Sequence, residues 1–212
     1  MSRLLDSGLE QLTTNLFRMG ELSEKALRIA IMGFMNGTDS SGEIGELSEM
    51  LLAMTVGAED KAFELMVKYQ PVASDLRIIN SYMKIAYDFE RYGRYALDIA
   101  LTQRKFAASQ KCTYSQDLMD KMAEKALIMV HTSIDALKSN DGEMAKSLAN
   151  SEKEVDAMYS DYLDKLSKAP PGTKCLIFTT LVGRYLERIA DHATYIGESI
   201  YYIATGQKIL IR

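Results

Sequence analysis

The sequence predicts an all-α protein built as two tandem antiparallel three-helix bundles that are related by a pseudo-two-fold repeat. Three observations favour this fold. Only 3 of the 212 residues are proline, which suits long helices because proline breaks a helix interior. Apolar residues recur at three- and four-residue intervals, beginning with the segment from Leu4 to Ala30, and this spacing is typical of one buried helix face. The third observation is an internal repeat.

Turn-forming segments divide the chain into six expected helices. The first break, from Asn36 to Gly45, opens on Asn-Gly-Thr-Asp, a sequence typical of turns. Ser40 and Glu43 are spaced as in a capping box for the second helix. Prolines and Ser-Asn-Asp-Gly mark the later breaks. The first expected helix runs from about residue 4 to the break that opens at Asn36, and the second runs from that break to about residue 69. The other four run over about 74–106, 115–138, 143–167 and 173–205.

The repeat becomes visible when the chain is compared with itself. Glu24–Leu27 has the same four residues as Glu124–Leu127. Glu90, Arg91, Ala96 and Ile99 match Glu187, Arg188, Ala193 and Ile196, and the prolines fall before the third and the sixth helix only. Matches at one nearly constant spacing indicate a duplicated unit. We expect one three-helix unit over residues 1–108 and a second over 109–212, with antiparallel helices because the connecting loops are short.

Composition limits the functions that need consideration. A net charge of -4 argues against a broad nucleic-acid surface. No uncharged stretch approaches the length of a membrane-spanning helix, and Asp6 and Glu10 interrupt any signal-peptide core. The two cysteines, Cys112 and Cys175, are interpreted as buried thiols in a reducing compartment. The sequence therefore predicts a cytoplasmic protein with no nucleic-acid partner and no membrane insertion.

Common catalytic signatures are missing from the sequence. It has no phosphate-cradling glycine loop, nucleophile elbow, paired-histidine zinc helix or dinucleotide fingerprint. The two histidines are His131 and His192. Neither completes the Glu-x-x-His pair of a di-iron bundle, because residues 128 and 189 are both isoleucine. We therefore expect no enzyme activity, and a carboxylate-rich helical metalloenzyme stays the alternative.

Carboxylates on the sixth expected helix are the candidate metal ligands. Glu187 and Asp191 are four residues apart, and Glu198 returns to nearly the same face. Oxygen ligands at this spacing suit hard cations such as Mg²⁺, Ca²⁺, Mn²⁺ or iron. The other reading is a solvated helix face on which arginines pair with these acids. Neighbouring helices offer further acids, which are Glu59 and Asp60 in the first unit and Glu152, Glu154 and Asp156 in the second.

The first unit departs from this pattern. Glu90 matches Glu187, but Arg94 stands at the position that matches Asp191. A guanidinium in a ligand position repels a cation, so we expect an ion pair between Glu90 and Arg94. Asp98, one turn further along, is the remaining acid of this face.

Four segments together resemble a known family. They are Gln70–Arg77 (QPVASDLR), Asp88–Gly93 (DFERYG), Tyr185–Ala193 (YLERIADHA) and Tyr202–Gly206 (YIATG). In these segments the chain resembles the phosphate-uptake regulator family, PhoU, and the resemblance covers nearly the whole chain.

The resemblance implies a cytoplasmic, non-enzymatic negative regulator of phosphate uptake and phosphate homeostasis. It implies contact with the ATPase subunit of the phosphate ABC transporter and, where one is present, with a sensor histidine kinase. The apolar and aromatic content of the long helices makes us expect a homodimer. A structural helical adaptor unrelated to phosphate is the remaining alternative.

The resemblance also implies a divalent or iron-type metal on a Glu/Asp-x-x-x-Asp motif in each repeat. Glu187 and Asp191 match this motif in the second unit, and Asp156 is added as a candidate ligand because it lies on the neighbouring expected helix of the same unit. Glu90 and Asp98 are the candidates in the first unit, where Arg94 departs from the motif. One metal site at most is therefore expected.

Overall fold

The computed structural model describes residues 2–106, 116–167 and 173–211, and within them the secondary structure consists of six α-helices with no strand. The predicted all-α fold is confirmed. The bounds are α1 (Ser2–Asn36), α2 (Ser41–Tyr69), α3 (Ser74–Phe106), α4 (Gln116–Ser139), α5 (Gly142–Leu166) and α6 (Thr173–Thr205). The predicted junction between residues 108 and 109 lies outside the described residues and stays a prediction.

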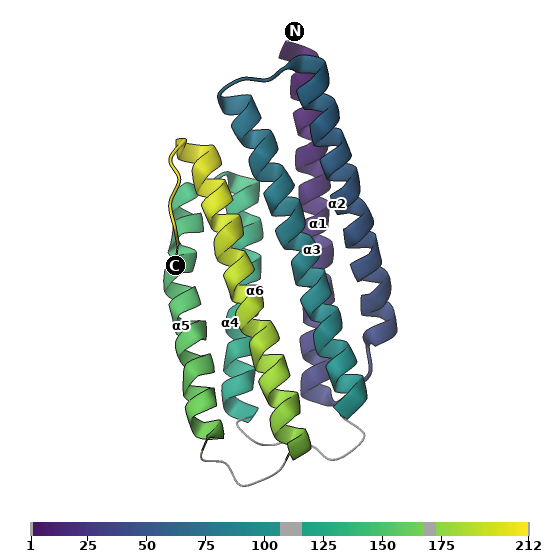
Figure 1. Ribbon diagram of the computed structural model, residues 1–212, viewed down its shortest axis with the longest axis vertical. Helices are drawn as coiled ribbons and strands as arrows, with labels where there is room; N and C mark the ends of the chain where they lie inside the picture. Colours follow the sequence, from purple (N-terminus) through teal and green to yellow (C-terminus); the bar gives the residue numbers. More distant parts are fainter. Residues whose placement is uncertain (1, 107–115, 168–172, 212) are drawn as a thin grey trace.

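The helices lie side by side in two groups, α1–α3 and α4–α6 (Figure 1). α3 packs along α6 and α1 packs along α4, so the two groups share one continuous apolar core. The predicted stripe on α1 supplies part of it, since Leu12, Leu16 and Met19 are buried. Successive helices run in opposite directions within each group, as expected for short connections.

The start of α2 differs from the expected capping box. Ser40 is the N-cap residue, but its side chain makes no capping hydrogen bond. Its ψ angle of 10° departs from the extended backbone that aims a cap side chain at the first turn. Asp39 accepts the hydrogen bond at this helix start instead, because its Oδ1 lies 2.9 Å from the backbone N–H of Ser41, which donates to it. The capping-box prediction was wrong.

The start of α5 has a conventional cap. Asp141 has an extended backbone, and its Oδ1 accepts hydrogen bonds from the N–H groups of Glu143 and Met144, both at 2.9 Å. Replacing Asp141 with alanine removes the acceptor of both hydrogen bonds, and we expect a loss of about 1 kcal/mol of unfolding free energy. Urea denaturation measures this loss. Asp141→Asn is the matched control and should stay near the wild-type value, because asparagine caps helices about as well as aspartate.

The cysteine interpretation needs correction. Cys175 takes part in a disulfide bond, whereas the sequence analysis expected a reduced thiol. A disulfide requires that the fold brings two sulfur atoms into a suitable geometry and that an oxidant removes two electrons from the thiols; distance along the chain does not exclude it. Cys112 lies outside the described residues. The cysteines therefore do not indicate a reducing compartment.

Membrane insertion was not expected for this chain. Among the described helices, none combines the length and the apolar character that a membrane crossing requires.

A buried polar pair holds α3 against α6. Asp88 Oδ1 lies 2.8 Å from His192 Nδ1, and both side chains are almost fully buried. The rings of Tyr87, Tyr95 and Tyr195 surround the imidazole, with centroids 5.2–6.2 Å away. Burial raises the pKa of Asp88, and the hydrogen bond from His192 opposes that rise. The pair thus links the two three-helix groups through one desolvated contact.

Candidate cation site

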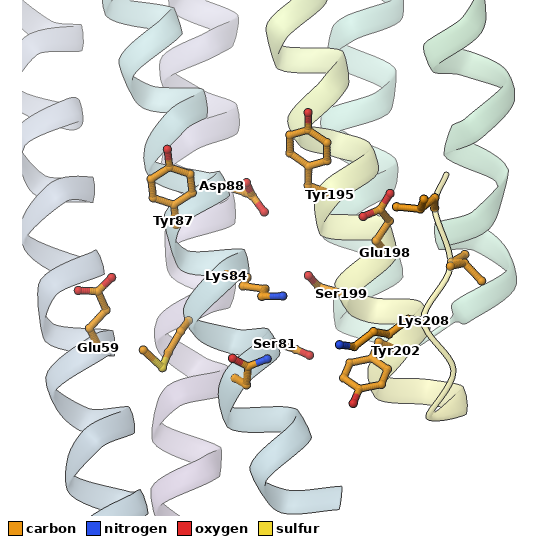
Figure 2. Close-up of a pocket in the computed structure, with 14 residues that line it drawn as sticks. Glu59, Ser81, Lys84, Tyr87, Asp88, Tyr195, Glu198, Ser199, Tyr202 and Lys208 are labelled. Carbon is orange, nitrogen blue, oxygen red and sulfur yellow. The ribbon is translucent and has the colours of Figure 1, made fainter. Parts of the chain in front are cut away.

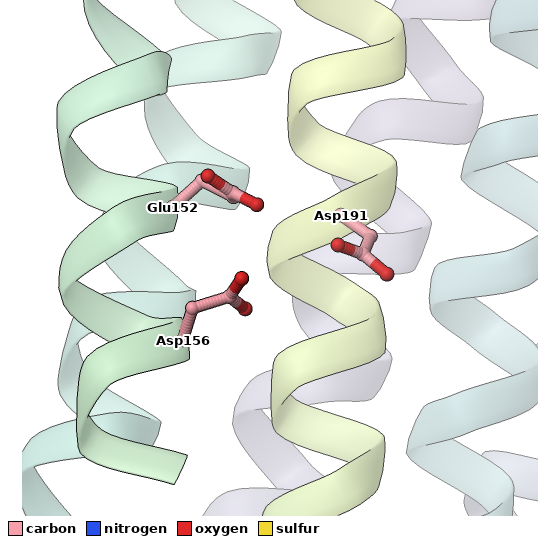
Figure 3. Close-up of side chains that lie close together, drawn as sticks. All are labelled: Glu152, Asp156 and Asp191. Carbon is pink, nitrogen blue, oxygen red and sulfur yellow. The ribbon is translucent and has the colours of Figure 1, made fainter. Parts of the chain in front are cut away.

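Three carboxylates from two helices converge on one face of the second group. Glu152 and Asp156 lie one turn apart on α5, and Asp191 faces them from α6 (Figure 3). One oxygen from each side chain lies within 4.8 Å of the other two. The four-residue spacing on α5 places both of its acids on the same helix face. The packing of α5 against α6 then brings Asp191 beside them.

The carboxylates are electrostatically unfavourable to one another. Burial is the main cause that raises the pKa of Glu152, and the negative charges of Asp156 and Asp191 raise it further. The pKa of Asp156 is also raised, first by burial and then by Asp191. Both shifts favour a neutral carboxyl group. A bound proton or a bound cation would remove the same repulsion.

Glu187 lies next to this cluster but is held differently. Burial raises its pKa, and the charge of Asp191 raises it further. Arg184 Nη1 donates to Glu187 Oε1 at 2.5 Å, and Arg188 Nη1 donates to Asp191 Oδ2 at 2.5 Å. Glu187 Oε2 is buried and has no hydrogen-bond partner in the described part of the chain. The arginine pairing of the alternative interpretation is therefore present, and it leaves one buried acceptor unused.

The donor set fits a hard cation. Mg²⁺ and Ca²⁺ bind oxygen ligands at about 2.0–2.6 Å, so two ligands of one ion lie within about 5 Å of each other. The 4.8 Å limit within Glu152, Asp156 and Asp191 meets that condition. Glu187 beside them keeps one buried carboxylate oxygen without a hydrogen-bond partner in the described residues. These residues could hold a divalent or iron-type ion.

The first-unit candidates are not gathered in this way. The described residues contain no comparable acidic group around Glu90 and Asp98. Arg94 is exposed, and no ion pair within 4 Å joins it to Glu90 in the described residues, so the expected Glu90–Arg94 pair was wrong. Burial raises the pKa of Asp98, while Arg94 and then Arg91 lower it. Arg94 thus acts on Asp98 rather than pairing with Glu90.

The remaining acids proposed from the sequence lie elsewhere. Glu154 forms an ion pair with Lys125 of α4 at 2.6 Å. Glu198 Oε1 accepts a hydrogen bond from the Ile211 N–H at 2.9 Å. Glu59 lines a groove between α3 and α6. Among the three acids suggested on α5, Glu152 and Asp156 lie together beside Asp191, and Glu154 is not part of this group.

Comparison with known proteins agrees with the fold and the repeat. The family model described as the PhoU domain matches this chain twice, over residues 16–102 and 119–200. The two matches cover most of the chain and fall on the two helical groups. This chain belongs to the PhoU family.

Individual PhoU relatives match over nearly their full length. A "Phosphate-specific transport system accessory protein PhoU homolog" of Rhizobium meliloti is 30% identical, over 95% of this chain and 87% of the relative. One of the same name from Clostridium acetobutylicum is 28% identical, over 98% of this chain and 97% of the relative. The crystal structure of PhoU from Pseudomonas aeruginosa superposes with a TM-score of 0.91 at 26% identity, over 95% of this chain and 99% of that one.

A second solved structure supports the fold alone. It is the phosphate transport system regulatory protein PhoU from Streptococcus pneumoniae, with a TM-score of 0.76 at 20% identity, over 97% of this chain and 99% of that one.

Repulsion within the carboxylate cluster should make this PhoU chain more stable when Glu152 is replaced by a neutral residue. Because its native pKa is raised, Glu152 contributes stability that is fully present below its ordinary pKa of 4.5 and is lost as pH rises through the raised value. Glu152→Gln stays neutral and should therefore gain about 1 kcal/mol of unfolding free energy near pH 8 in chelator. Urea denaturation from pH 4 to pH 8 checks this. A gain of equal size at pH 4 would contradict the electrostatic cause.

Proposed function

We propose that this chain is a non-enzymatic regulator of phosphate uptake and phosphate homeostasis. It acts as an adaptor on the ATPase subunit of a phosphate ABC transporter and, where one is present, on a sensor histidine kinase. The PhoU domain matches in both halves of the chain support this proposal. Further support comes from the relatives, which carry the name of accessory proteins of the phosphate-specific transport system.

The acidic cluster is the feature that we assign to this regulation. Glu152, Asp156 and Asp191 would hold one divalent or iron-type ion, and Glu187 would add a fourth carboxylate beside it. A bound cation supplies positive charge that stabilises the otherwise repelling carboxylates. It would thereby fix the relative position of α5 and α6 and change the charge of the face that they share. A partner that contacts this face would respond to both changes.

Three further properties complete the proposal. The protein works in the cytoplasm, where the ATPase subunit of an ABC transporter is located. Its effect on phosphate uptake is negative. The degenerate first unit contributes scaffold rather than a second cation, because Arg94 leaves a positive charge on the face where the second unit has Asp191.

We also propose a homodimer. A stripe of exposed apolar side chains on α2 supports it, namely Leu52, Val56, Phe63 and Val67, each at least 50% exposed. At 100° per residue these positions fall within an arc of about 60°, and such a stripe marks an interaction site on many proteins. Analytical ultracentrifugation should show a dimer that Phe63→Glu converts to a monomer. A wild-type monomer at micromolar concentration would contradict this part of the proposal.

Capture of the transporter tests the main proposal. Purified tagged protein should retain the ATPase subunit of the phosphate ABC transporter from the same genome, and it should not retain the ATPase subunit of an unrelated ABC importer. We expect the Asp156→Asn/Asp191→Asn variant to retain much less than the wild type. Equal retention of the two ATPase subunits by the wild-type protein would refute the assignment.

A further inference from the structure

A groove separate from the acidic cluster lies between the two helical groups. α3 and α6 form its walls, Glu59 of α2 lies at one edge, and the residues after α6 lie at the other (Figure 2). Its volume is about 840 Å³, within the usual range of small-molecule sites of about 300–1,000 Å³. The groove thus has the dimensions of a ligand site.

Two lysines face each other across this groove. The ammonium groups of Lys84 on α3 and Lys208 after α6 point toward one another (Figure 2). Both side chains are exposed, and neither forms an ion pair within the described residues. Ser199 and Tyr202 also line this part of the groove, and the Ser199 hydroxyl lies near Lys84. This part of the groove therefore carries two lysines without a close ion pair, although the charge of Lys84 also acts on Asp88 in the groove wall.

A third cation adds to the positive charge of these two lysines. The charged groups of Lys208 and Arg77 both lie over the ring of Tyr202, at 5.5 Å and 5.6 Å from its centroid. The Nε of Arg77 is buried, and it has no hydrogen-bond partner in the part of the chain described. Arg77 thus supplies positive potential that no carboxylate of the described residues neutralises through an ion pair.

The opposite end of the groove has a different character. The rings of Tyr87 and Tyr195 lie there, and the carboxylates of Glu59 and Glu198 line the two sides of the groove, Glu59 at about the level of Lys84. Glu198 is already engaged by the Ile211 N–H, while Asp88, deeper in the wall, is engaged by His192. Aromatic faces favour a flat ring, and carboxylates favour hydroxyl or amino donors.

We propose that this groove binds a nucleoside monophosphate. The phosphate carries a charge of nearly -2 at neutral pH and fits between Lys84 and Lys208. The base lies against the tyrosine rings, and ribose or amino donors reach Glu59 and Glu198. This inference goes beyond the proposed regulation and does not depend on the acidic cluster.

Isothermal titration calorimetry with adenosine monophosphate, in chelator and 0.15 M salt, tests the proposal. We expect saturable 1:1 binding with a sub-millimolar Kd. Lys84→Gln and Lys208→Gln should each weaken binding about tenfold, because a charge-assisted hydrogen bond contributes about that much. Lys121→Gln, at an exposed lysine near the start of α4, is the matched control and should bind as the wild type does. Tyr87→Leu, at a half-exposed ring, should weaken binding several-fold.

Two other ligands test the lysine part and the tyrosine part of the groove separately. Adenosine and inorganic phosphate should each bind at least tenfold more weakly than the monophosphate. Adenosine that binds equally well would overturn the role of the lysines, and inorganic phosphate that binds equally well would overturn the role of the tyrosines. Absence of binding by the monophosphate would overturn the whole proposal. Asp156→Asn should retain full binding, which keeps this result separate from the cation site.

Discussion

Asp191→Arg is expected to abolish the response of this protein to a divalent cation. In the wild type, Mn²⁺ at about 100 times its Kd should stabilise the folded state by about 2.7 kcal/mol, which raises the Tm of a chain of this size by about 5–10 °C. The arginine places a guanidinium among Glu152 and Asp156, where it neutralises the cluster and repels the cation. The substitution also gives the second unit the residue that the first unit has as Arg94.

Differential scanning calorimetry with Mn²⁺ and with chelator measures this response. Asp164→Asn is the matched control, because Asp164 is an exposed acid on α5, the helix that carries Glu152 and Asp156, and should leave the Tm rise intact. The wild type and Asp191→Arg should have similar Tm values in chelator, since the introduced guanidinium would pair with the nearby carboxylates. A full Mn²⁺-induced rise in Asp191→Arg would place the cation elsewhere in the molecule.

His192→Ala is expected to destabilise the protein by about 3–5 kcal/mol, because it leaves the buried carboxyl group of Asp88 without its partner. Urea denaturation measures the change in unfolding free energy. The contact joins α3 to α6, so the loss should weaken the association of the two helical groups.

A double substitution distinguishes the lost pair from a simple cavity. Asp88→Leu/His192→Leu removes both polar groups and should be more stable than His192→Ala, since no buried charge is left unpaired. If the double variant is less stable than His192→Ala, the tyrosine cage around the imidazole matters more than the pair does.

The helices were predictable because their signals are local. The turn residues around Asn36, the prolines at 71 and 170–171 and the apolar spacing define six segments, and the predicted limits of the third helix are those of α3. Helix ends that depend on exact backbone angles were less predictable. Ser40 has a suitable side chain for a cap, but its ψ angle directs the capping role to Asp39.

The composition of the acidic cluster was only partly predictable. Spacing alone puts Glu187 and Asp191 on one face of α6, and Asp156 was expected to join them. Whether Glu152 or Glu154 accompanies Asp156 depends on how α5 is rotated against α6, and that rotation is set by packing. The four-residue interval between Glu152 and Asp156 is the sequence signal that favours Glu152.

The contact between the two groups had no sequence signal. Asp88 and His192 are 104 residues apart, and each could equally be a surface residue on its own helix. The groove beside them depends on the same packing of α3 against α6, together with the path of the chain after α6. Features between the repeats therefore require the three-dimensional structure.

Phosphate uptake in cells tests most directly the claim that the acidic cluster in the second unit serves phosphate regulation. The measurement is ³²P-phosphate uptake in phosphate-rich medium by a deletion strain that expresses either the wild-type protein or Asp191→Arg at equal levels. We predict that the deletion strain takes up phosphate at a raised rate, that the wild-type protein restores the low rate, and that Asp191→Arg does not. Restoration of the low rate by Asp191→Arg, or unchanged uptake in the deletion strain, would contradict the proposed function.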